Sequence, residues 1–482
     1  MVIIPRPFLI KEKGGFFRRS GAVHCSGNAE FHSIMETVQQ HFNGLDGGPI
    51  RCTKEESLDG ESYRLDIKED SIDLSARTSS GIYHGFQTIR QLLLSDEAIQ
   101  CVHIEDQSRF AWRGFMLDTS RHFYSVAWIK KLLDALSLHH INRFHWHLTD
   151  DQGWRLPIKQ YPLLTEIGSK RLECRPVWGR YSGGFYSHDD IRDIVAFAAA
   201  RQIEIIPEVD FPGHASAILA SYPGLGCTGG PYRVEDRHGI FEDVLCAGND
   251  SLFDLAHAVF DTLGELFPSS FVHIGGDEVR FNRWNNCPKC QKRMHDCGLS
   301  SARALQSWIT VRLATMLEER GKTAIGWDEV LEDSDNYCLP SDVIVMSWRG
   351  RTGGDAAVQR GHKVIMAPNT EGCYLDYRHS NDPEEPGQIG LSPIDVLYNF
   401  DPLNGIEAAL HTQILGAQCN LWSELIYAGK IAEYMIFPRI CACAEALWTP
   451  ASDKSFERFK ADLNVHQQRL DKLGLNQYRI NA

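Results

Sequence analysis

Residues 271–278 read Phe-Val-His-Ile-Gly-Gly-Asp-Glu, an apolar run that ends on two glycines and two adjacent carboxylic acids. Other short apolar runs have the same form and also end on polar or aromatic residues. They are 114–118, 143–150, 203–210, 323–329, 343–348, 363–368 and 414–422. Helical patterns separate several of these runs, at 126–140, 189–201 and 303–320. Strands that alternate with helices in this way predict an α/β fold, a parallel (β/α)8 TIM barrel whose chemistry collects at the carboxyl ends of its strands.

Two segments depart from this pattern. Residues 331–342, between the fifth and sixth predicted strands, show no helical periodicity. Either the helix is missing there or one of the two strand assignments is wrong. Residues 378–393 are irregular in composition, and we expect them to form a mobile loop over the mouth of the barrel.

The N-terminal part of the chain follows a different rhythm. Residues 63–67 and 71–75 alternate apolar and polar side chains, as half-buried antiparallel strands do. Amphipathic helical patterns lie at 31–42 and 82–93. Because no cluster of reactive side chains accompanies them, we expect a small non-catalytic α+β domain over residues 1–107 and a catalytic barrel domain over residues 108–482. A last amphipathic helix, with Phe456, Phe459, Leu463 and Leu470 on one face, closes the barrel domain.

The composition narrows the classes of partner. The 482 residues include 49 basic and 63 acidic side chains, a formal net charge of −14, which argues against nucleic acid and anionic membrane as partners. No uninterrupted apolar stretch approaches the roughly 18 residues that a membrane span needs. The first residues contain Pro5 and Pro7 and no small-residue cleavage site, unlike a signal peptide. The 14 cysteines are then expected to be reduced thiols, and the location to be cytoplasmic.

Polar and aromatic residues gather at the predicted strand ends. Asp118, Asp150, Asp210 and the pair Asp277–Glu278 end four strands, and three tryptophans end others: Trp327, Trp348 and Trp422. With Arg121 and Tyr374 they form a typical sugar-binding set, in which aromatic faces stack on the C–H face of a pyranose and charged groups bind its hydroxyls. No Gly-rich phosphate loop follows any strand, so a nucleotide site finds little support.

The adjacent acids Asp277 and Glu278 are the most informative pair. Neighbouring residues of a strand point to opposite faces, so they cannot flank one bond as the usual glycosidase pair does. At a strand end, where the backbone turns, both can reach one ligand from different sides. This arrangement suits a general acid, Glu278, and an orienting carboxylate, Asp277. The preceding Gly275-Gly276 would permit close approach of a neighbouring backbone or a ligand.

The segment His273-Ile-Gly-Gly-Asp-Glu-Val279 resembles the signature of family 20 glycoside hydrolases, the β-N-acetylhexosaminidases. Further segments match that family's barrel motifs in order, and residues 83–93 resemble the end of its small domain. The barrel segments are 118–123, 145–151, 208–214, 374–376 and 420–424. The resemblance implies a carbohydrate substrate with a terminal N-acetylhexosamine, exo-acting release of N-acetylglucosamine or N-acetylgalactosamine from the non-reducing end, and no cofactor.

The resemblance also implies a mechanism in which the substrate provides the nucleophile, an exception to the two-carboxylate scheme. Glu278 would protonate the leaving oxygen while the carbonyl oxygen of the 2-acetamido group attacks the anomeric carbon, forming an oxazolinium-like intermediate. Asp277 would hold the acetamido N–H, and Tyr374 would donate to the acetamido oxygen. Water deprotonated by Glu278 would then open the ring with net retention of configuration.

The other pocket residues take their implied roles from the same family pattern. Arg121 would grip the 3- and 4-hydroxyls of the terminal sugar and block extension, and Glu424 and Asp376 would bind hydroxyls at positions 4 and 6. Asp150 and His214 would support the protonation state of Glu278 through a hydrogen-bond chain. Trp327 and Trp348 would wall the acetamido pocket, and Trp422 would lie beneath the ring. No metal ligand is assigned to this site.

Two other functions remain as alternatives. The segment His145-Trp-His147 places two imidazoles on one face of a strand, as in metal-dependent amidohydrolases on the same barrel. That function would require further histidines at the ends of later strands, but tryptophan or carboxylate residues occupy those positions. A non-catalytic carbohydrate-binding protein would normally have lost an acid or orienting position, and each matching position here is intact.

The spacing Cys287-Pro-Lys-Cys290, with His295 and Cys297 nearby, would suit a structural zinc, but no second C-x-x-C accompanies it. The sequence therefore favours free thiols in a surface excursion. It does not determine the choice between gluco and galacto substrates, the natural aglycone or the oligomeric state; a homodimer is the default expectation for a barrel.

Overall fold

Eight parallel strands hydrogen-bond into a closed barrel in the order β13-β14-β15-β16-β17-β20-β7-β8. This computed structural model describes residues 1–43, 45–95, 98–172, 181–332 and 338–480. The barrel strands are β7 (Trp112–Asp118), β8 (Arg143–His147), β13 (Glu204–Glu208), β14 (Phe271–His273), β15 (Thr323–Trp327), β16 (Ile344–Ser347), β17 (Val364–Met366) and β20 (Ile414–Leu421). Each lies within a predicted apolar run or begins within two residues of one, so the predicted TIM barrel is confirmed.

The fourth strand is shorter than the apolar run predicts, because it ends at His273 rather than at Glu278. Gly275 and Gly276 take φ angles of 67° and 96°, which lead the backbone out of the strand. A Cβ atom on Gly275 would stand 1.9 Å from Asp210 Oδ1. Only glycine lets the chain pass this close to the neighbouring strand end.

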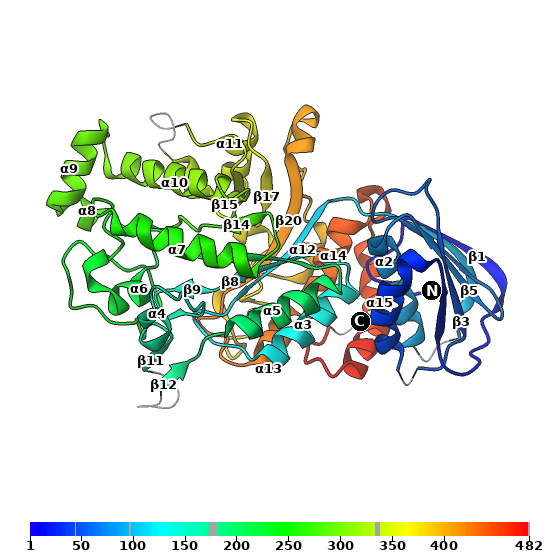
Figure 1. Ribbon diagram of the computed structural model, residues 1–482. Coiled ribbons are helices and arrows are strands. Elements are labelled where there is room, and N and C mark those ends of the chain that lie inside the picture. The colour runs from blue at the N-terminus through cyan, green and yellow to red at the C-terminus, as the bar shows by residue number, and fades with distance from the viewer. Residues whose placement is uncertain (44, 96–97, 173–180, 333–337, 481–482) are drawn as a thin grey trace.

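Helices surround the barrel (Figure 1). They are α3 (Val126–Leu138), α5 (His188–Ala199), α7 (Ser251–Leu266), α10 (Ala302–Glu318), α11 (Thr352–Gln359), α12 (Ile394–Asn399), α13 (Gly429–Ile436), α14 (Arg439–Trp448) and α15 (Phe456–Lys472). The predicted helices at 126–140, 189–201 and 303–320, and the last one, are all present. No helix in the described residues is long and apolar enough to cross a membrane.

Between β15 and β16 the described residues form a single turn of 3₁₀-helix, Asp328–Leu331, and no α-helix. Both strand assignments are correct. In the described residues between the two strands there is no α-helix, as the first of the two interpretations held. Residues 333–337 of that segment lie outside the described residues.

Short elements occupy the connections at the carboxyl ends of the strands. They are β9 (Thr149–Asp150), β10 (Gly153–Trp154), α4 (Leu163–Glu166), β11 (Lys170–Leu172), β12 (Tyr181–Gly183), α6 (Ser216–Ser221), α8 (Asn282–Asn286), α9 (Pro288–Cys297), β18 (Tyr377–Arg378) and β19 (Gln388–Leu391). Helices α8 and α9 lie at the end of the molecule farthest from the N-terminal domain (Figure 1).

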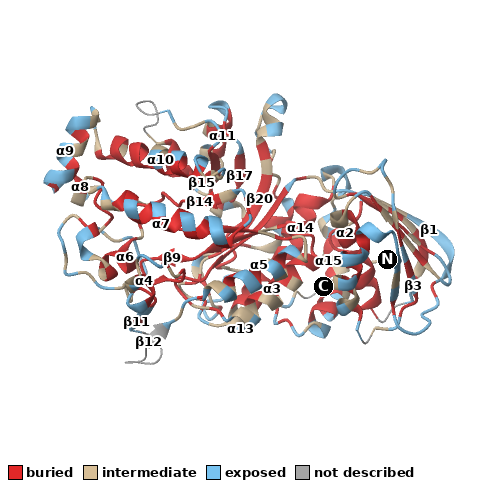
Figure 2. Ribbon diagram, in the orientation of Figure 1, coloured by how far each residue is buried: buried red, intermediate tan, exposed pale blue. Residues whose placement is uncertain are grey.

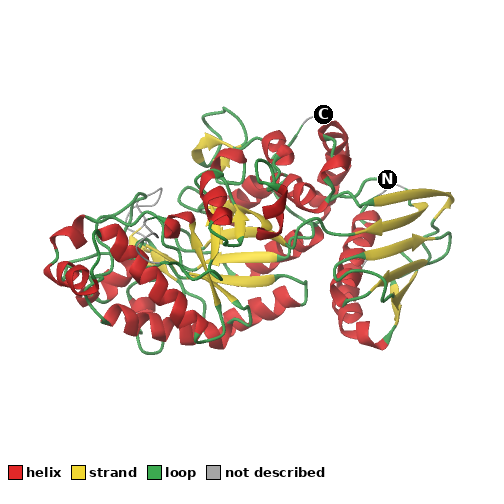
Figure 3. Ribbon diagram, turned by 90° about the horizontal axis from the view of Figure 1, so that it is seen from above, coloured by secondary structure: helices red, strands yellow, loops and turns green. Residues whose placement is uncertain are grey.

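The N-terminal domain is a mixed sheet in the order β1-β6-β4-β5-β3-β2, with two helices on one face (Figure 3). Its elements are β1 (Leu9–Phe16), β2 (His24–Gly27), α1 (His32–Gln39), β3 (Pro49–Lys54), β4 (Tyr63–Ile67), β5 (Ile72–Ala76), α2 (Ser79–Leu93) and β6 (Gln100–Asp106). Strand β4 coincides with the prediction, and β5 begins one residue later than predicted. The sequence pattern did not reveal β1, because most of its side chains are exposed and do not alternate.

Helix α2 joins the two domains. It packs on β4 and β5 on one side and on the barrel helix α3 on the other, and nearly all of its side chains are buried, as Figure 2 shows. Trp448 at the end of α14 belongs to the core of the small domain. Arg113 of β7 donates to both carboxylate oxygens of Glu61, at 2.8 and 2.9 Å. The small domain therefore packs against the amino-terminal end of the barrel, away from the predicted site.

Candidate active site

A pocket of about 260 Å³ opens at the carboxyl ends of the barrel strands. Ten of the eleven predicted site residues line it: Arg121, His214, Asp277, Glu278, Trp327, Trp348, Tyr374, Asp376, Trp422 and Glu424. Asp150, the eleventh, lies behind the pocket and contacts both Arg121 and His214. A larger hollow of about 660 Å³ lies at the amino ends of the strands, beside Arg143 and Ser269, and no predicted site residue lines it. Because barrel chemistry collects at the carboxyl ends, the smaller pocket is the candidate site.

The turn after β14 presents both acids to this pocket. Glu278 has a φ of 52°, in the left-handed region that a non-glycine residue seldom adopts. Together with the two preceding glycines, this turn brings two adjacent side chains to one side. His214 Nε2 lies 3.6 Å from Asp277 Oδ2 and 3.7 Å from Glu278 Oε2. The geometry therefore has the form predicted for a strand end, where neighbouring residues can reach one ligand.

A chain of charged groups backs His214. Its Nδ1 lies 3.2 Å from Asp150 Oδ1, and the other oxygen of Asp150 lies 2.9 Å from Nε2 of His147. His147 Nδ1 in turn contacts Glu208. Burial alone would lower the pKa of His214, but the charges of Asp150 and Asp277 outweigh it and raise that pKa well above its ordinary value. His214 is therefore an imidazolium at neutral pH, facing the two acids.

Glu208 is the buried end of this chain, and sequence reasoning assigned it no role. His145 Nε2 lies 2.9 Å and His273 Nδ1 3.0 Å from its carboxylate, and Trp327 Nε1 donates to it at 3.0 Å. Burial would raise the pKa of Glu208, but the imidazoles of His147, His273 and His145 lower it well below its usual range. The two imidazoles that suggested an amidohydrolase both engage this carboxylate rather than the pocket, so the metal-dependent alternative is not supported.

Asp210, at the end of the β13 segment, forms a carboxyl pair with Asp277. The Gly276 N–H donates to Asp210 Oδ1 at 2.9 Å. Burial and the charge of Glu208 raise the pKa of Asp210 to about 7, although His214 opposes them. Burial and the Asp210 charge raise the pKa of Asp277 well above its usual range. The two acids therefore titrate as a pair that holds a proton at neutral pH, and within the described residues Asp277 Oδ1 has no hydrogen-bond partner.

Arg121 closes one end of the pocket. Its guanidinium lies 2.7 Å from Asp150 and 3.2 Å from Asp118, and its Nε donates to Gln152 Oε1 at 2.9 Å. Glu424 lies 3.8 Å away on the pocket side. Arg121 therefore forms a structural ion pair with Asp118 and also lines the pocket. Its guanidinium is held by partners on three sides.

Two further carboxylates face the pocket with an oxygen free. Asp376 Oδ1 and Glu424 Oε2 are buried and have no hydrogen-bond partner in the part of the chain that the structure describes. Burial raises the pKa of both groups, and for Asp376 the neighbouring Glu424 charge adds to the effect. Buried acceptors without partners are costly, so these two atoms are prepared for hydroxyl donors of a ligand.

Aromatic rings form the remaining wall. Trp348 and Tyr374 stack at 6.2 Å with an angle of 14° between their planes. Trp422 lies 5.9 Å from Trp327 and 6.5 Å from Tyr374. Trp327 is 1% exposed, and it also lines the pocket. Burial raises the pKa of Tyr374 well above its usual range, which keeps its phenol a hydrogen-bond donor.

Besides Glu208, sequence reasoning missed four residues at or beside the pocket. Tyr377, Gln388 and Ile389 line the mouth of the pocket, and Ile389 is 93% exposed. The last two belong to segment 378–393, which does lie over the mouth as expected; its mobility stays a prediction. Glu329 accepts a hydrogen bond from Trp348 Nε1 at 2.9 Å, and burial together with the Asp277 charge raises its pKa to about 8. Signals for these residues were available: Tyr377 directly follows the matched segment 374–376, and Glu329 ends the predicted run 323–329.

Two family models match this sequence. Residues 110–451 match the catalytic domain of glycosyl hydrolase family 20, and residues 3–107 match domain 2 of the same family. The chain belongs to glycosyl hydrolase family 20.

Individual proteins and structures agree with this assignment. A beta-hexosaminidase of Porphyromonas gingivalis is 42% identical over 431 residues, which are 87% of this chain and 55% of that protein. A beta-hexosaminidase of Vibrio furnissii is 35% identical over 402 residues, 80% of this chain and 65% of that protein. The crystal structure of an exo β-N-acetylglucosaminidase from Vibrio harveyi in complex with N-acetylglucosamine has a TM-score of 0.90 at 31% identity, covering 99% of this chain and 78% of that one. The chain thus spans 55% and 65% of the lengths of these two curated relatives.

Proposed function

We propose that this chain is an exo-acting β-N-acetylhexosaminidase, which releases terminal N-acetylglucosamine or N-acetylgalactosamine from the non-reducing end of glycosides. The observation that carries the proposal is the position of Asp277 and Glu278. Both line one pocket and both approach His214 Nε2, at 3.6 and 3.7 Å. This arrangement suits a proton donor beside an orienting carboxylate.

In the proposed reaction the substrate's own acetamido group is the nucleophile. Glu278 gives its proton to the leaving oxygen as the glycosidic C–O bond breaks and the acetamido carbonyl oxygen bonds to the anomeric carbon. The free Oδ1 of Asp277 accepts the acetamido N–H and stabilises the positive charge of the oxazolinium. The neutral phenol of Tyr374 donates to the acetamido oxygen. Each well-placed group of this kind contributes about 3–4 kcal/mol.

The second step reverses the first with water in place of the leaving group. Water adds to the anomeric carbon and gives a proton to the Glu278 carboxylate, while the bond to the acetamido oxygen breaks. The acetamido group is restored, Glu278 is again protonated, and the configuration is retained. His214 Nε2 lies 3.7 Å from Glu278 Oε2, so the imidazole stays beside the Glu278 side chain through both steps.

The blocked end of the pocket supports exo action. Arg121 donates hydrogen bonds in the plane of its guanidinium, and buried Asp118 and Asp150 stand directly behind it. A sugar whose hydroxyls bind Arg121 therefore has no room for a further residue in that direction. The free oxygens of Asp376 and Glu424 provide acceptors for the remaining hydroxyls. The name of the Vibrio harveyi relative, an exo β-N-acetylglucosaminidase, supports the same specificity.

The test is release of 4-nitrophenol from its N-acetyl-β-glucosaminide by the wild type and by Glu278→Gln. Removing a general acid costs typically 10²–10⁴-fold, so we expect kcat to fall by about that factor while the variant stays folded. The corresponding β-glucoside, which carries a hydroxyl in place of the acetamido group, should not be cleaved by either protein. Equal activity of the two proteins on the acetamido substrate would refute the assignment of Glu278.

A further inference from the structure

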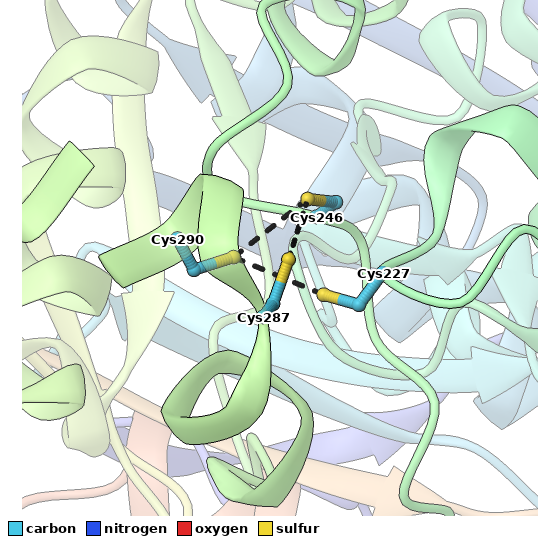
Figure 4. Close-up of side chains that lie close together, drawn as sticks. All are labelled: Cys227, Cys246, Cys287 and Cys290. Atoms are coloured by element: carbon cyan, nitrogen blue, oxygen red, sulfur yellow. Dashed lines mark hydrogen bonds between the residues drawn. The ribbon is translucent and has the colours of Figure 1, made fainter. Parts of the chain in front are cut away.

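Four cysteines meet beside the barrel, at the base of the excursion formed by α8 and α9 (Figure 4). They are Cys227, Cys246, Cys287 and Cys290. Cys246 Sγ lies 3.8 Å from Cys287 Sγ and 3.7 Å from Cys290 Sγ, and Cys227 Sγ lies 3.8 Å from Cys290 Sγ. All four sulfur atoms lie within 4.8 Å of one another.

These spacings are those of thiolates around a single tetrahedral ion. Four sulfur atoms about 2.3 Å from a central zinc stand about 3.8 Å apart along each edge of the tetrahedron. Disulfide sulfurs would be about 2.05 Å apart, and each of the four cysteines is free. An iron–sulfur cluster would hold its thiolates farther apart, because several irons separate them.

The ligand set differs from the one that the sequence suggested. His295 and Cys297 do not take part: the His295 side chain is 90% exposed, and neither residue belongs to the four-cysteine group. Their places are taken by Cys227 and Cys246, which precede Cys290 by 63 and 44 residues. The C-x-x-C pair therefore does have partners, but they come from a separate loop.

The backbone holds the four thiols in place by packing and hydrogen bonds of its own. Cys287 precedes Pro288, the first residue of α9, so Cys290 follows in the first turn of that helix. The loop of Cys246 lies directly on this turn, because a Cβ atom on Gly248 would stand 2.2 Å from the carbonyl carbon of Lys289. Only glycine permits this approach.

A second set of contacts brings Cys227 to the group. Gly226 and Leu245 form an antiparallel bridge, and the Cys246 N–H donates to the Leu225 carbonyl at 2.8 Å. The buried Trp284 of α8 donates from Nε1 to the Leu245 carbonyl at 2.9 Å. Three chain segments thus converge on one point, each with its thiol already facing the others.

Burial and chemistry fit a soft, permanently bound cation. Cys246 and Cys290 are 0% exposed and Cys287 is 4% exposed, while Cys227 borders a surface hollow that also reaches Cys287. A set of four thiolates selects zinc over calcium, magnesium or manganese. Four ligands from the protein complete a tetrahedron, which is typical of structural zinc and leaves no position for a substrate or water.

We propose that Cys227, Cys246, Cys287 and Cys290 bind one structural zinc ion. The ion ties the connection after β13, which carries His214, to the connection after β14, which carries Asp277 and Glu278. Its position supports this role, since the Leu245 N–H, next to Cys246, donates to the Pro212 carbonyl at 3.0 Å. The zinc stabilises the loops around the pocket and takes no part in catalysis.

The test is the metal content of the full chain, purified without chelator or a nickel column. We expect mass spectrometry of the metals to find one zinc per wild-type chain. Cys246→Ser and Cys290→Ser should lose the zinc and melt at a lower temperature. Cys297→Ser, at the far end of α9, is the matched control and should keep one zinc and the wild-type melting temperature.

The coordination of the wild type decides the question even if the serine variants do not fold. X-ray absorption at the zinc edge should show four sulfur neighbours at about 2.3 Å. Cobalt-substituted protein should have the strong visible bands of tetrahedral thiolate coordination. Metal-free wild type, iron in place of zinc, or a thiol count showing two disulfides among these four cysteines would each overturn the proposal. None of these readouts is catalytic, so they stand apart from the test of Glu278.

Discussion

His214 Nε2 lies 3.6 Å from Asp277 Oδ2, although the two residues belong to connections that follow different barrel strands. His214 is buried and has a pKa well above its ordinary value, because Asp150 and Asp277 attract its proton more strongly than burial opposes it. The contact therefore joins a protonated imidazole to the carboxyl pair of Asp210 and Asp277, which holds a proton at neutral pH. Because of this contact, the stability of the fold depends on the protonation of the acids that we assign to catalysis.

The first prediction concerns that coupling. A raised histidine pKa gives stability that is fully present below the ordinary value of 6.5 and is lost as the pH rises through the raised value. His214→Gln removes one partner of a buried pair, so we expect it to lower the free energy of unfolding by roughly 3–5 kcal/mol at neutral pH. Urea unfolding across pH measures this, with the exposed His24→Gln as control. A difference that does not shrink at alkaline pH would contradict it.

The second prediction concerns the pair Asp210 and Asp277. The pKa of Asp210 is raised from 3.8 to about 7, so its protonated form stabilises the fold, and that stability is lost as the pH rises through about 7. Asp210→Asn keeps an oxygen for the Gly276 N–H and gives Asp277 a permanent hydrogen-bond donor.

We therefore expect the Asp210→Asn variant to unfold at a higher temperature than the wild type above pH 7, where the wild type has lost this stability. Its kcat/KM should no longer change near that pH, because the pair has no proton to release there. Thermal melts and pH–rate profiles of both proteins test this. Superimposable profiles would show that the two carboxyls do not share a proton.

The third prediction concerns Tyr374. Its raised pKa keeps the phenol protonated, and its ring stacks on Trp348. Tyr374→Phe keeps the ring and removes the donor, so kcat should fall by about 10²–10³-fold with little change in KM. Tyr377→Phe is the matched control, because that ring lies 5.6 Å from Tyr374 and lines the mouth. Equal losses in the two variants would place Tyr374 outside the chemistry.

The fourth prediction concerns the four-cysteine group. Gly248→Ala would place a methyl group 2.2 Å from the Lys289 backbone, so we expect a loss of about 1–3 kcal/mol in the free energy of unfolding. Gly264→Ala in α7 is the control, since nothing lies within 4 Å of its added Cβ, and it should stabilise by about 0.5–1 kcal/mol. Denaturant unfolding compares the two. A neutral Gly248→Ala would mean that the loop does not rest on the C-x-x-C turn.

The barrel could be predicted because each strand leaves a local signal, a short apolar run with polar or aromatic residues at its end. Asp150, Asp277 and Trp327 could be predicted from the pattern because they stand at or just after those ends. His214, Asp376 and Glu424 were implied by the resemblance to the family's motifs. Strand β1 could not be predicted, because it is an exposed edge strand whose side chains do not alternate between buried and exposed. The early end of β14 could not be predicted, because it depends on the close approach of Gly275 to Asp210, which only the folded structure determines.

The buried polar partners could not be predicted from spacing. Glu208 lies 61 residues from His147 in sequence and contacts it directly. Likewise Cys227 and Cys246 have no C-x-x-C spacing of their own, and the barrel connections bring them to Cys287 and Cys290. Such pairings depend on which loops are neighbours in space, and a single sequence does not contain that information in local form.

The most direct test of substrate-assisted catalysis is the rate of cleavage of 4-nitrophenyl glycosides whose N-acetyl group carries from no to three fluorine atoms. Fluorine withdraws electrons from the carbonyl oxygen and weakens it as a nucleophile. If that oxygen attacks the anomeric carbon, kcat/KM of the wild type must fall steeply with each added fluorine. A rate that does not depend on fluorination would contradict the account, because the nucleophile would then have to come from the protein or from water.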